Sequence, residues 1–291
     1  NNTGLIPDPI VDFDGQSSTA ILKFTSVADQ SGTATITVTV EDGGLDNDLA
    51  TQEDNGTINR TIVVKADAVN DAPSFNEIID RIFNEDSPQQ TVSVAGIVPG
   101  GGEYQSLRIT ASSSNTGLIP DPLVRGEGIV VDPIDMSGGV FQTSLSITPV
   151  ADQYGTATIT VTVEDAGLDN NLLLLIDNAM FSRTFDVMVN PVNDAPVLDD
   201  ISDLVLPEDS LAQIIDVTGI TAGGGEAQPL RLTANSNNLL LVPDPTIVSR
   251  VALGEENRLL GFMPLPNQYG VATIIVTVED GGLDLDLNTT E

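Results

Sequence analysis

The sequence predicts an all-β chain of two-sheet β-sandwich domains arranged end to end. Two observations lead to this fold class. Short segments with a hydrophobic residue at every second position recur along the 291 residues, separated by Gly, Pro, Asn and Asp, and no stretch has the apolar period of 3.6 that is typical of a helix. In addition, the same motifs return at a fixed spacing, as expected for tandem domains.

The repeat is clearest in the segment Val-Asn-Asp-Ala-Pro, which begins at Val69 and again at Val192, a displacement of 192 − 69 = 123 residues. We therefore predict one complete repeat, residues 74–196, between partial repeats at 1–73, truncated at its N-terminal side, and 197–291, truncated at its C-terminal side. This organisation is typical of a segment of a longer array. Two further motifs share the displacement: Glu85-Asp86-Ser87 with Glu208-Asp209-Ser210, and Gly100-Gly101-Gly102-Glu103 with Gly223-Gly224-Gly225-Glu226.

The strand prediction rests on alternation, which is best seen in residues 156–163, Thr-Ala-Thr-Ile-Thr-Val-Thr-Val. Successive side chains of a strand point to opposite faces, so the Ala, Ile and Val residues should cover a core while the threonines face solvent. Residues 107–111, 145–147 and 185–189 alternate in the same way. About seven such strands in a unit of roughly 100 residues indicate a two-sheet sandwich with Greek-key connections.

The composition excludes several classes of function. With 43 acidic and 10 basic residues the formal charge is −33, so the surface repels nucleic acid and anionic membranes, while 40% hydrophobic residues suffice for folded cores. The absence of Cys and His removes disulfides, thiol and Ser-His nucleophiles and the usual zinc, copper and haem ligands. No apolar run approaches the roughly 18 residues that span a bilayer. Hard cations bound by oxygen remain compatible with this composition.

The segment Asp67-Ala68-Val69-Asn70-Asp71-Ala72-Pro73-Ser74-Phe75 resembles the cadherin linker pattern of Asp, Asn-Asp, then Pro and an apolar residue. The second linker keeps Asn193-Asp194 and Pro196 but begins with Asn190. The whole chain resembles the tandem cadherin-like, Ig-like β-sandwich repeats of large bacterial surface proteins and adhesins. The resemblance implies Greek-key sandwiches joined end to end, an extracellular or cell-surface location, and calcium bound between repeats.

The resemblance also implies the ligands of that calcium. Glu85-Asp86 matches the early-strand glutamate of cadherins. Asp29 and Asp152 occupy the positions where cadherins carry a Leu-Asp-Arg-Glu motif. Asp165 and Asp280 match a cadherin aspartate at the end of a strand. Glu103 and Glu226 occupy the approximate place of another linker-facing acidic motif. The joint between the second and third repeats would use Glu85, Asp86, Asp152, Asn193, Asp194 and Asp280, with Glu226 as a further candidate. The joint between the first and second repeats would use Asp29, Asp67, Asn70, Asp71 and Asp165, together with Glu103.

Calcium suits such a joint physically. It takes about six to eight oxygen ligands at roughly 2.3 to 2.6 Å and binds extracellular modules at about 10⁻⁴ to 10⁻³ M. Without a cation, two carboxylates about 4 Å apart near a protein surface repel by roughly 4 kcal/mol. The alternative is that Asn-Asp before Ala-Pro forms an ordinary turn, and that Glu85 and Glu208 are solvated charges that protect a strand edge.

These patterns favour a structural function over an enzymatic one. The leading interpretation is a calcium-stiffened stalk or filament segment of a secreted or cell-surface adhesive protein, whose partners are neighbouring repeats of the same chain. The alternative is a carbohydrate- or protein-binding module appended to a larger extracellular enzyme, but the chain has no Trp and only 4% aromatic residues for stacking on sugars. Gly100-Gly101-Gly102 is interpreted as a flexible loop between sheets, because neither a Lys-Ser pair nor a helix follows as in a phosphate-binding loop.

One apolar segment distinguishes the second repeat from the first. Residues Leu172 to Ile176 are Leu-Leu-Leu-Leu-Ile, whereas residues 49–53 of the first repeat are Leu-Ala-Thr-Gln-Glu. In a strand-like hairpin arm, about half of these side chains would stay exposed. We therefore predict lateral self-association through this segment, with the alternative that the loop from Arg125 to Val140 covers it within the same domain.

Overall fold

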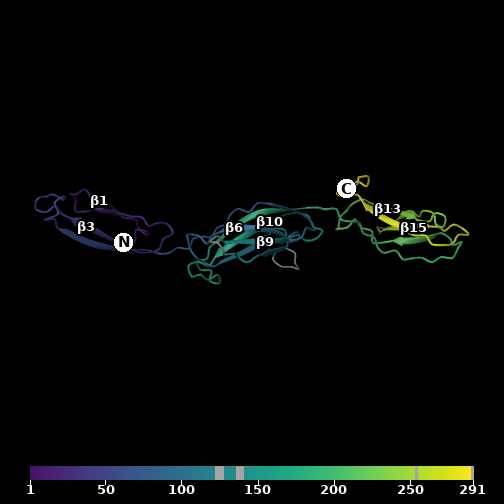
Figure 1. The fold of residues 1–291 in the computed structure, drawn as a ribbon, viewed down its shortest axis with the longest axis horizontal. Helices are drawn as coiled ribbons and strands as arrows, with labels where there is room; N and C mark the ends of the chain where they lie inside the picture. Colours follow the sequence, from purple (N-terminus) through teal and green to yellow (C-terminus); the bar gives the residue numbers. More distant parts are fainter. Residues whose placement is uncertain (122–127, 136–140, 253–254, 290–291) are drawn as a thin grey trace.

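Three β-sandwich domains follow one another along an extended line (Figure 1). The computed structural model describes residues 1–121, 128–135, 141–252 and 255–289. Within these ranges every regular element is a strand, which confirms the predicted all-β class. No helix there is long and apolar enough to cross a membrane. All strand pairings of the described residues fall within the predicted ranges 1–73, 74–196 and 197–291, and the exact boundaries stay a prediction.

The middle domain is a sandwich of a four-stranded sheet, in the order β5-β11-β10-β7, and a three-stranded sheet, in the order β6-β9-β8. Its seven strands agree with the number expected from the sequence. The chain crosses repeatedly between the two sheets, and β5 is the one strand here that pairs in parallel, with β11. The strands are β5 (Arg81–Asn84), β6 (Gln90–Ile97), β7 (Leu107–Ser113), β8 (Gly128–Val131), β9 (Phe141–Thr148), β10 (Gly155–Asp165) and β11 (Met180–Asn190).

The core of the middle domain follows the alternation of the sequence. In β10 the side chains of Ala157, Ile159, Val161 and Val163 are buried against Leu145 and Ile147 of β9 and other core residues. The threonines of β10 lie on the opposite face, where the Thr158 hydroxyl donates a hydrogen bond of 2.7 Å to Asp186 of β11. Each fully buried aliphatic side chain contributes about 1.5 to 3 kcal/mol, so this domain has its own stable core.

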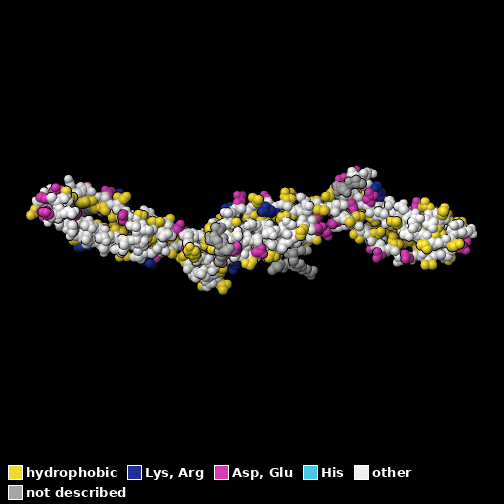
Figure 2. Space-filling model, viewed as in Figure 1, with side chains coloured by type: hydrophobic (Ala, Val, Ile, Leu, Met, Phe, Trp, Pro, Cys, Tyr) yellow, Lys and Arg dark blue, Asp and Glu magenta, His cyan; other side chains and the backbone are white. Residues whose placement is uncertain are grey.

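The first and third domains contain fewer strands and leave more of their hydrophobic residues exposed. Val40 is 56% exposed, whereas Val163, which lies 123 residues further on, is fully buried (0%) in the middle domain. Figure 2 shows hydrophobic side chains along the sheets of both outer domains. The first domain pairs β1 (Ile10–Asp12) with β2 (Ile21–Lys23) and β3 (Gly32–Glu41) with β4 (Thr57–Ala66). The third has sheets β12-β15-β14 and β13-β16, formed by β12 (Gln213–Val217), β13 (Leu230–Ser236), β14 (Thr246–Ala252), β15 (Glu255–Phe262) and β16 (Ile274–Asp280).

The apolar segment Leu172–Ile176 lies in the connection between β10 and β11, and it is not a strand. It forms turns, so the expectation of alternating exposure in a hairpin arm is wrong. The side chains of Leu173, Leu174, Leu175 and Ile176 are all exposed, and Leu173 and Ile176 reach 85% and 86%. The alternative, a cover by the loop from Arg125 to Val140, falls partly on residues 125–127 and 136–140, which lie outside the described part of the chain.

Candidate metal centre

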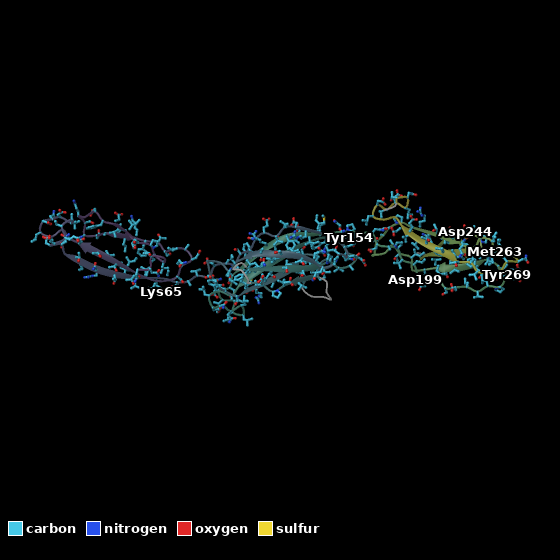
Figure 3. The ribbon with its side chains drawn as sticks, viewed as in Figure 1. Lys65, Tyr154, Asp199, Asp244, Met263 and Tyr269 are labelled. Carbon is cyan, nitrogen blue, oxygen red and sulfur yellow. The ribbon has the colours of Figure 1, made fainter. Side chains whose placement is uncertain are left out.

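The three domains point the same way along the chain, so the end of one domain meets the beginning of the next. Tyr154 lies at the end of the middle domain that faces the third, and its counterpart Tyr269 lies at the far end of the third domain (Figure 3). Near Tyr154, two turns bring Asp86, which follows β5, beside Asp152, which precedes β10. The backbone N–H of Asp152 donates to a carboxylate oxygen of Asp86 at 3.1 Å.

Both aspartates have a left-handed backbone conformation, with φ of 58° at Asp86 and 57° at Asp152. Asp and Asn tolerate this region better than other residues with side chains. The same turns recur in the third domain, where Asp209 and Asn267 have φ of 59° and 58° and the N–H of Asn267 donates to Asp209 at 2.8 Å. The pair of turns is therefore a repeated feature of the domain end.

Asp194 of the linker completes an acidic cluster at this end. One carboxylate oxygen from each of Asp86, Asp152 and Asp194 lies within 4.8 Å of the other two. These three come from two turns of the middle domain and from the linker to the third, as the sequence predicts. Acidic side chains are visible at this junction in Figure 2.

Glu85 lies beside the cluster and is almost fully buried. Its carboxylate accepts a hydrogen bond of 2.6 Å from the N–H of Val192 at the start of the linker. Burial raises the pKa of Glu85 above its ordinary value, and the charges of Asp86, Asp194 and Glu226 raise it further, although the hydrogen bond from Val192 opposes this. The pKa of Asp194 is likewise raised, first by burial and then by the charges of Asp86 and Asp152.

The chemistry of these residues fits a hard cation. All the side chains that converge offer carboxylate oxygens, the ligands that calcium prefers. One carboxylate oxygen of Asp194 is buried and has no hydrogen-bond partner, which is costly for an anionic group unless a cation is bound. Within the described ranges this is the one group of three acidic side chains with such spacing.

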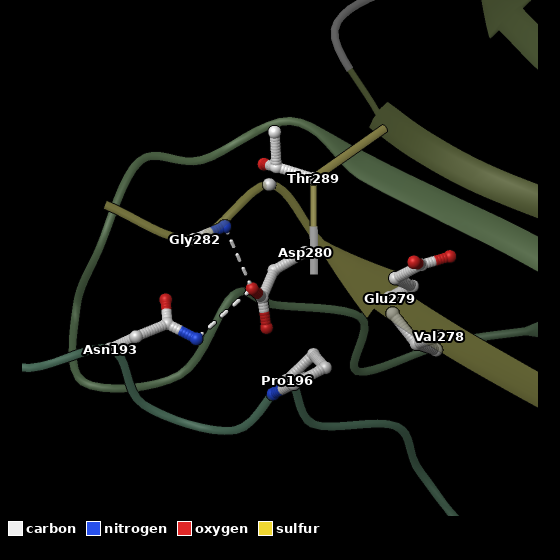
Figure 4. Close-up of a pocket in the computed structure, with 8 residues that line it drawn as sticks. Asn193, Pro196, Val278, Glu279, Asp280, Gly282 and Thr289 are labelled. Atoms are coloured by element: carbon white, nitrogen blue, oxygen red, sulfur yellow. Dashed lines mark hydrogen bonds between the residues drawn. The ribbon is translucent and has the colours of Figure 1, made fainter. Parts of the chain in front are cut away.

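Asn193 and Asp280 lie on the other side of the same joint, toward the third domain. The amide of Asn193 donates to Asp280 at 3.2 Å, and the N–H of Gly282 donates to the same oxygen at 3.0 Å (Figure 4). Glu226 is also engaged, because it accepts from the N–H of Asp194 at 3.3 Å and from the amide of Gln228 at 2.8 Å. The structure thus separates these residues into a carboxylate half and a hydrogen-bonded half.

The joint between the first and second domains repeats the hydrogen-bonded half. The amide of Asn70 donates to Asp165 at 3.0 Å and to the carbonyl of Asp177 at 2.8 Å, and Gln105 donates to Asn70 at 2.7 Å. Glu103 accepts from the N–H of Asp71 at 3.4 Å. Asp165 is fully buried, and its second carboxylate oxygen has no hydrogen-bond partner among the described residues.

Two predicted ligands of this first joint lie apart from the hydrogen-bonded group. Asp67 is exposed and forms an ion pair with Lys65. Asp29 lies on an exposed turn with φ of 57°, which is the counterpart of the Asp152 turn. The carboxylate half is consequently assembled in this chain at the second joint, and the corresponding site at the first joint stays a prediction.

Sequence reasoning missed Gln105 and Gln228, which bind the linker in both joints. Their signal is present in the sequence, because the Gly-Gly-Gly-Glu motif extends in both repeats to Gly-Gly-Gly-Glu-x-Gln, at residues 100–105 and 223–228. The motif lies between two sheets, as predicted. The first two glycines of each motif pack on the linker, however, and all three have positive φ, from 43° to 112°.

No model of a known protein family matches this chain, and no curated protein matches it. Among solved structures it is similar to repeats EC22–24 of mouse cadherin-23, with 14% identity over 96% of this chain and 81% of that chain and a TM-score of 0.44. Repeats EC1–3 of mouse clustered PcdhgC3 share 13% identity over 87% of this chain and 73% of theirs, with a TM-score of 0.34.

The surface-layer protein SbsC, domains 4–9, is similar at 14% identity over 90% of this chain and 36% of that one, with a TM-score of 0.27. These proteins are tandem arrays, and this chain is similar to them as a series of cadherin-like and Ig-like β-sandwiches. Because the TM-scores are low, the fold assignment rests on the strand order and pairing described above.

Proposed function

We propose that this chain is a structural segment of a secreted or cell-surface repeat protein, an adhesive stalk or filament whose joints are stiffened by calcium. The observation that carries the proposal is the convergence of Asp86, Asp152 and Asp194 from two domain-end turns and the linker, with oxygens within 4.8 Å. A bound cation would connect the middle domain directly to the linker. An array of such joints transmits force and gains reach with each repeat.

The electrostatics support this role. Three carboxylates at such spacing repel one another, and the chain already carries a formal charge of −33. In a chelator the repulsion acts between the end of the middle domain and the linker, so it loosens the joint without opening either core. Calcium reverses the sign of the interaction. Binding at about 10⁻⁴ to 10⁻³ M would require millimolar calcium, which is a condition of the cell exterior.

Calorimetric titration of the 291-residue chain with calcium tests the cation site. We expect binding at submillimolar to millimolar concentration, and about a hundredfold weaker binding at the second joint after Asp194→Asn, which removes one ligand charge. The matched control is Asp71→Asn, the equivalent change in the first joint, which should leave the second joint intact. Absence of binding in the native chain at millimolar calcium would reject the proposal.

We also propose that copies of the chain associate laterally through Leu173, Leu174, Leu175 and Ile176. The four exposed side chains form an apolar tip on the connection between β10 and β11. The neighbouring carboxylates of Asp169 and Asp177 accept hydrogen bonds from backbone N–H groups of their own loop, at 2.9 Å in both cases. Burying two or three of these side chains contributes about 1.5 to 3 kcal/mol each, which can offset repulsion between acidic copies.

Sedimentation of the native chain against the Leu173→Ser, Leu175→Ser double variant measures this association. We expect a concentration-dependent larger species that the double variant lacks, with thermal stability unchanged because these side chains are already exposed. The pair Leu45→Ser and Leu49→Ser, in the equivalent loop of the first domain, serves as the matched control. Unchanged assembly in the double variant would exclude this surface.

A further inference from the structure

The second linker makes its described hydrogen bonds to two different domains. The bond before the Val192–Asn193 peptide goes to the middle domain, and the bonds after it go to the third domain. Val192 is bound to the upstream domain, because its N–H donates to Glu85 at 2.6 Å, and Glu85 is itself held by a backbone bond of 2.9 Å to Asn190. The next residue, Asn193, is bound downstream. Its side-chain amide nitrogen donates to Asp280 at 3.2 Å, and its side-chain oxygen Oδ1 accepts from Gln228 at 2.7 Å.

The glycines of residues 223–228 bring this loop unusually close to Asp194. A Cβ atom placed on Gly224 would lie 1.9 Å from a carboxylate oxygen of Asp194, and one on Gly223 would lie 2.4 Å from the carbonyl oxygen of Ala195. Both glycines also have positive φ. A side chain at either position would push the linker off the downstream domain, so glycine is required for the contact.

Glu226 and Gln228 complete the contact through hydrogen bonds. One oxygen of Glu226 accepts from the N–H of Asp194 and from Gln228, so this carboxylate is used to hold the linker backbone. Beyond it, Val197 and Thr221 exchange two backbone hydrogen bonds of 3.0 and 3.1 Å. The first joint has the same arrangement, in which Gly101, Glu103 and Gln105 contact Asp71 and Asn70.

We propose that the Gly-Gly-Gly-Glu-x-Gln segments are cation-independent latches that fix each linker to the domain that follows it. The pivot of the second joint then lies between Val192 and Asn193. The latch also positions the Asp194 carboxylate against Asp86 and Asp152, which makes Gln228 a positioning residue for the cation site. This last consequence rests on the proposed calcium function, whereas the latch itself does not.

Spin-label distances test the latch directly, because the chain has no cysteine and labels can be placed singly. Ala195→Cys with Tyr269→Cys reports the distance from the linker to the downstream domain, and Thr184→Cys with Ala195→Cys reports the distance from the upstream domain to the linker. We call the first pair of labels the downstream pair and the second the upstream pair. In the presence of a chelator we expect a narrow distance distribution for the downstream pair and a broad one for the upstream pair. Calcium should narrow the distance distribution of the upstream pair.

Gln228→Met removes the donor while preserving the length of the side chain. We expect it to broaden the downstream pair even in chelator and to weaken calcium binding about tenfold, a loss typical of residues that orient a ligand. Gly224→Ala should have the same effects by displacing Asp194. The matched control is Gln105→Met in the first joint, which should leave both distributions of the second joint unchanged.

The outcomes separate the two proposals. A downstream pair that broadens in chelator in the native chain, or that stays narrow in Gln228→Met, would overturn the latch. A downstream pair that is narrow throughout, together with an upstream pair that calcium fails to narrow, would support the latch and reject the cation site.

Discussion

At the scale of single residues, the joint depends on carboxyl groups whose charged forms are unfavourable in the absence of a cation. Glu85 and Asp194 both have raised pKa values, caused first by burial and then by neighbouring acidic groups. A raised pKa in the folded joint means that the folded state binds protons more tightly than the unfolded state. Without a cation, the joint is therefore stabilised as the pH falls from 7 through these raised pKa values, and the gain is complete below the ordinary carboxyl range of about 4.

Cation binding should show the opposite pH dependence. Protons and calcium compete for the same oxygens, so we expect calcium affinity to fall as the pH is lowered through the raised pKa values, with proton release on binding in that window. Calorimetry in two buffers of different ionisation enthalpy at each pH measures the protons released. Asp194→Asn should reduce the release, and an affinity that stays constant from pH 7 down to the ordinary carboxyl range of about 4 would contradict this competition.

The sequence allowed the acidic residues of the site to be predicted, but not which hydrogen-bond partners each carboxylate has. Asp86, Asp152 and Asp194 were expected together from their places in the repeat, and the structure brings them together. Glu226 and Asp280 were also expected as ligands, which stays a prediction, and the structure shows that they accept hydrogen bonds from the linker and adjacent backbone. A residue type shows that oxygen is offered, whereas the partner of that oxygen depends on loop geometry at glycines with positive φ.

At the scale of elements, a cross-strand ion pair joins β7 and β10 in the four-stranded sheet of the middle domain, at the end of β10. Arg108 of β7 donates from Nε to Glu164 of β10 at 3.0 Å, and Asn178 donates to the other oxygen at 3.0 Å. Burial alone would raise the pKa of Glu164, but the hydrogen bonds from Asn178 and Arg108 outweigh it and lower the pKa. The carboxylate thus stays charged in a buried position next to Asp165.

Removal of Arg108 should destabilise the middle domain. Arg108→Leu leaves the charge of Glu164, whose side chain is 5% exposed, without its cation, and we expect a loss of about 2 to 3 kcal/mol in the free energy of unfolding. The matched control is Arg231→Leu in the third domain, where Glu279 is 43% exposed and the loss should be about 1 kcal/mol or less. Chemical denaturation of both variants measures the difference, and equal losses would contradict this assignment.

Strands were more predictable than the connections between them. Residues 156–163 alternate strictly, and β10 buries the predicted face, because burial on one side of a sheet fixes the register. Leu172–Ile176 was expected in a hairpin arm but forms exposed turns. Its uninterrupted apolar residues have no period of two, and Asp177 binds back to the N–H of Leu168, which closes the segment into a loop.

At the scale of the whole molecule, the chain is a series of domains whose mutual orientation depends on short joints. The middle sandwich has its acidic turns at Asp86 and Asp152 at one end and its latch loop, residues 100–105, at the other, so each of its two joints combines the end of one domain with the beginning of the next. A formal charge of −33 favours spacing between domains unless cations bind. Calcium is expected to change the shape of this series more than the fold of its members.

Small-angle scattering of the 291-residue chain, in calcium and in chelator at constant ionic strength, measures whether a cation stiffens the joints. We expect a stiff rod in calcium and a broader ensemble of bent shapes in chelator, with circular dichroism unchanged because the cores do not depend on the cation. Asp194→Asn in calcium should scatter like a chain whose second joint is free. Identical curves for the native chain in the two conditions would contradict the claim that a cation stiffens the joints.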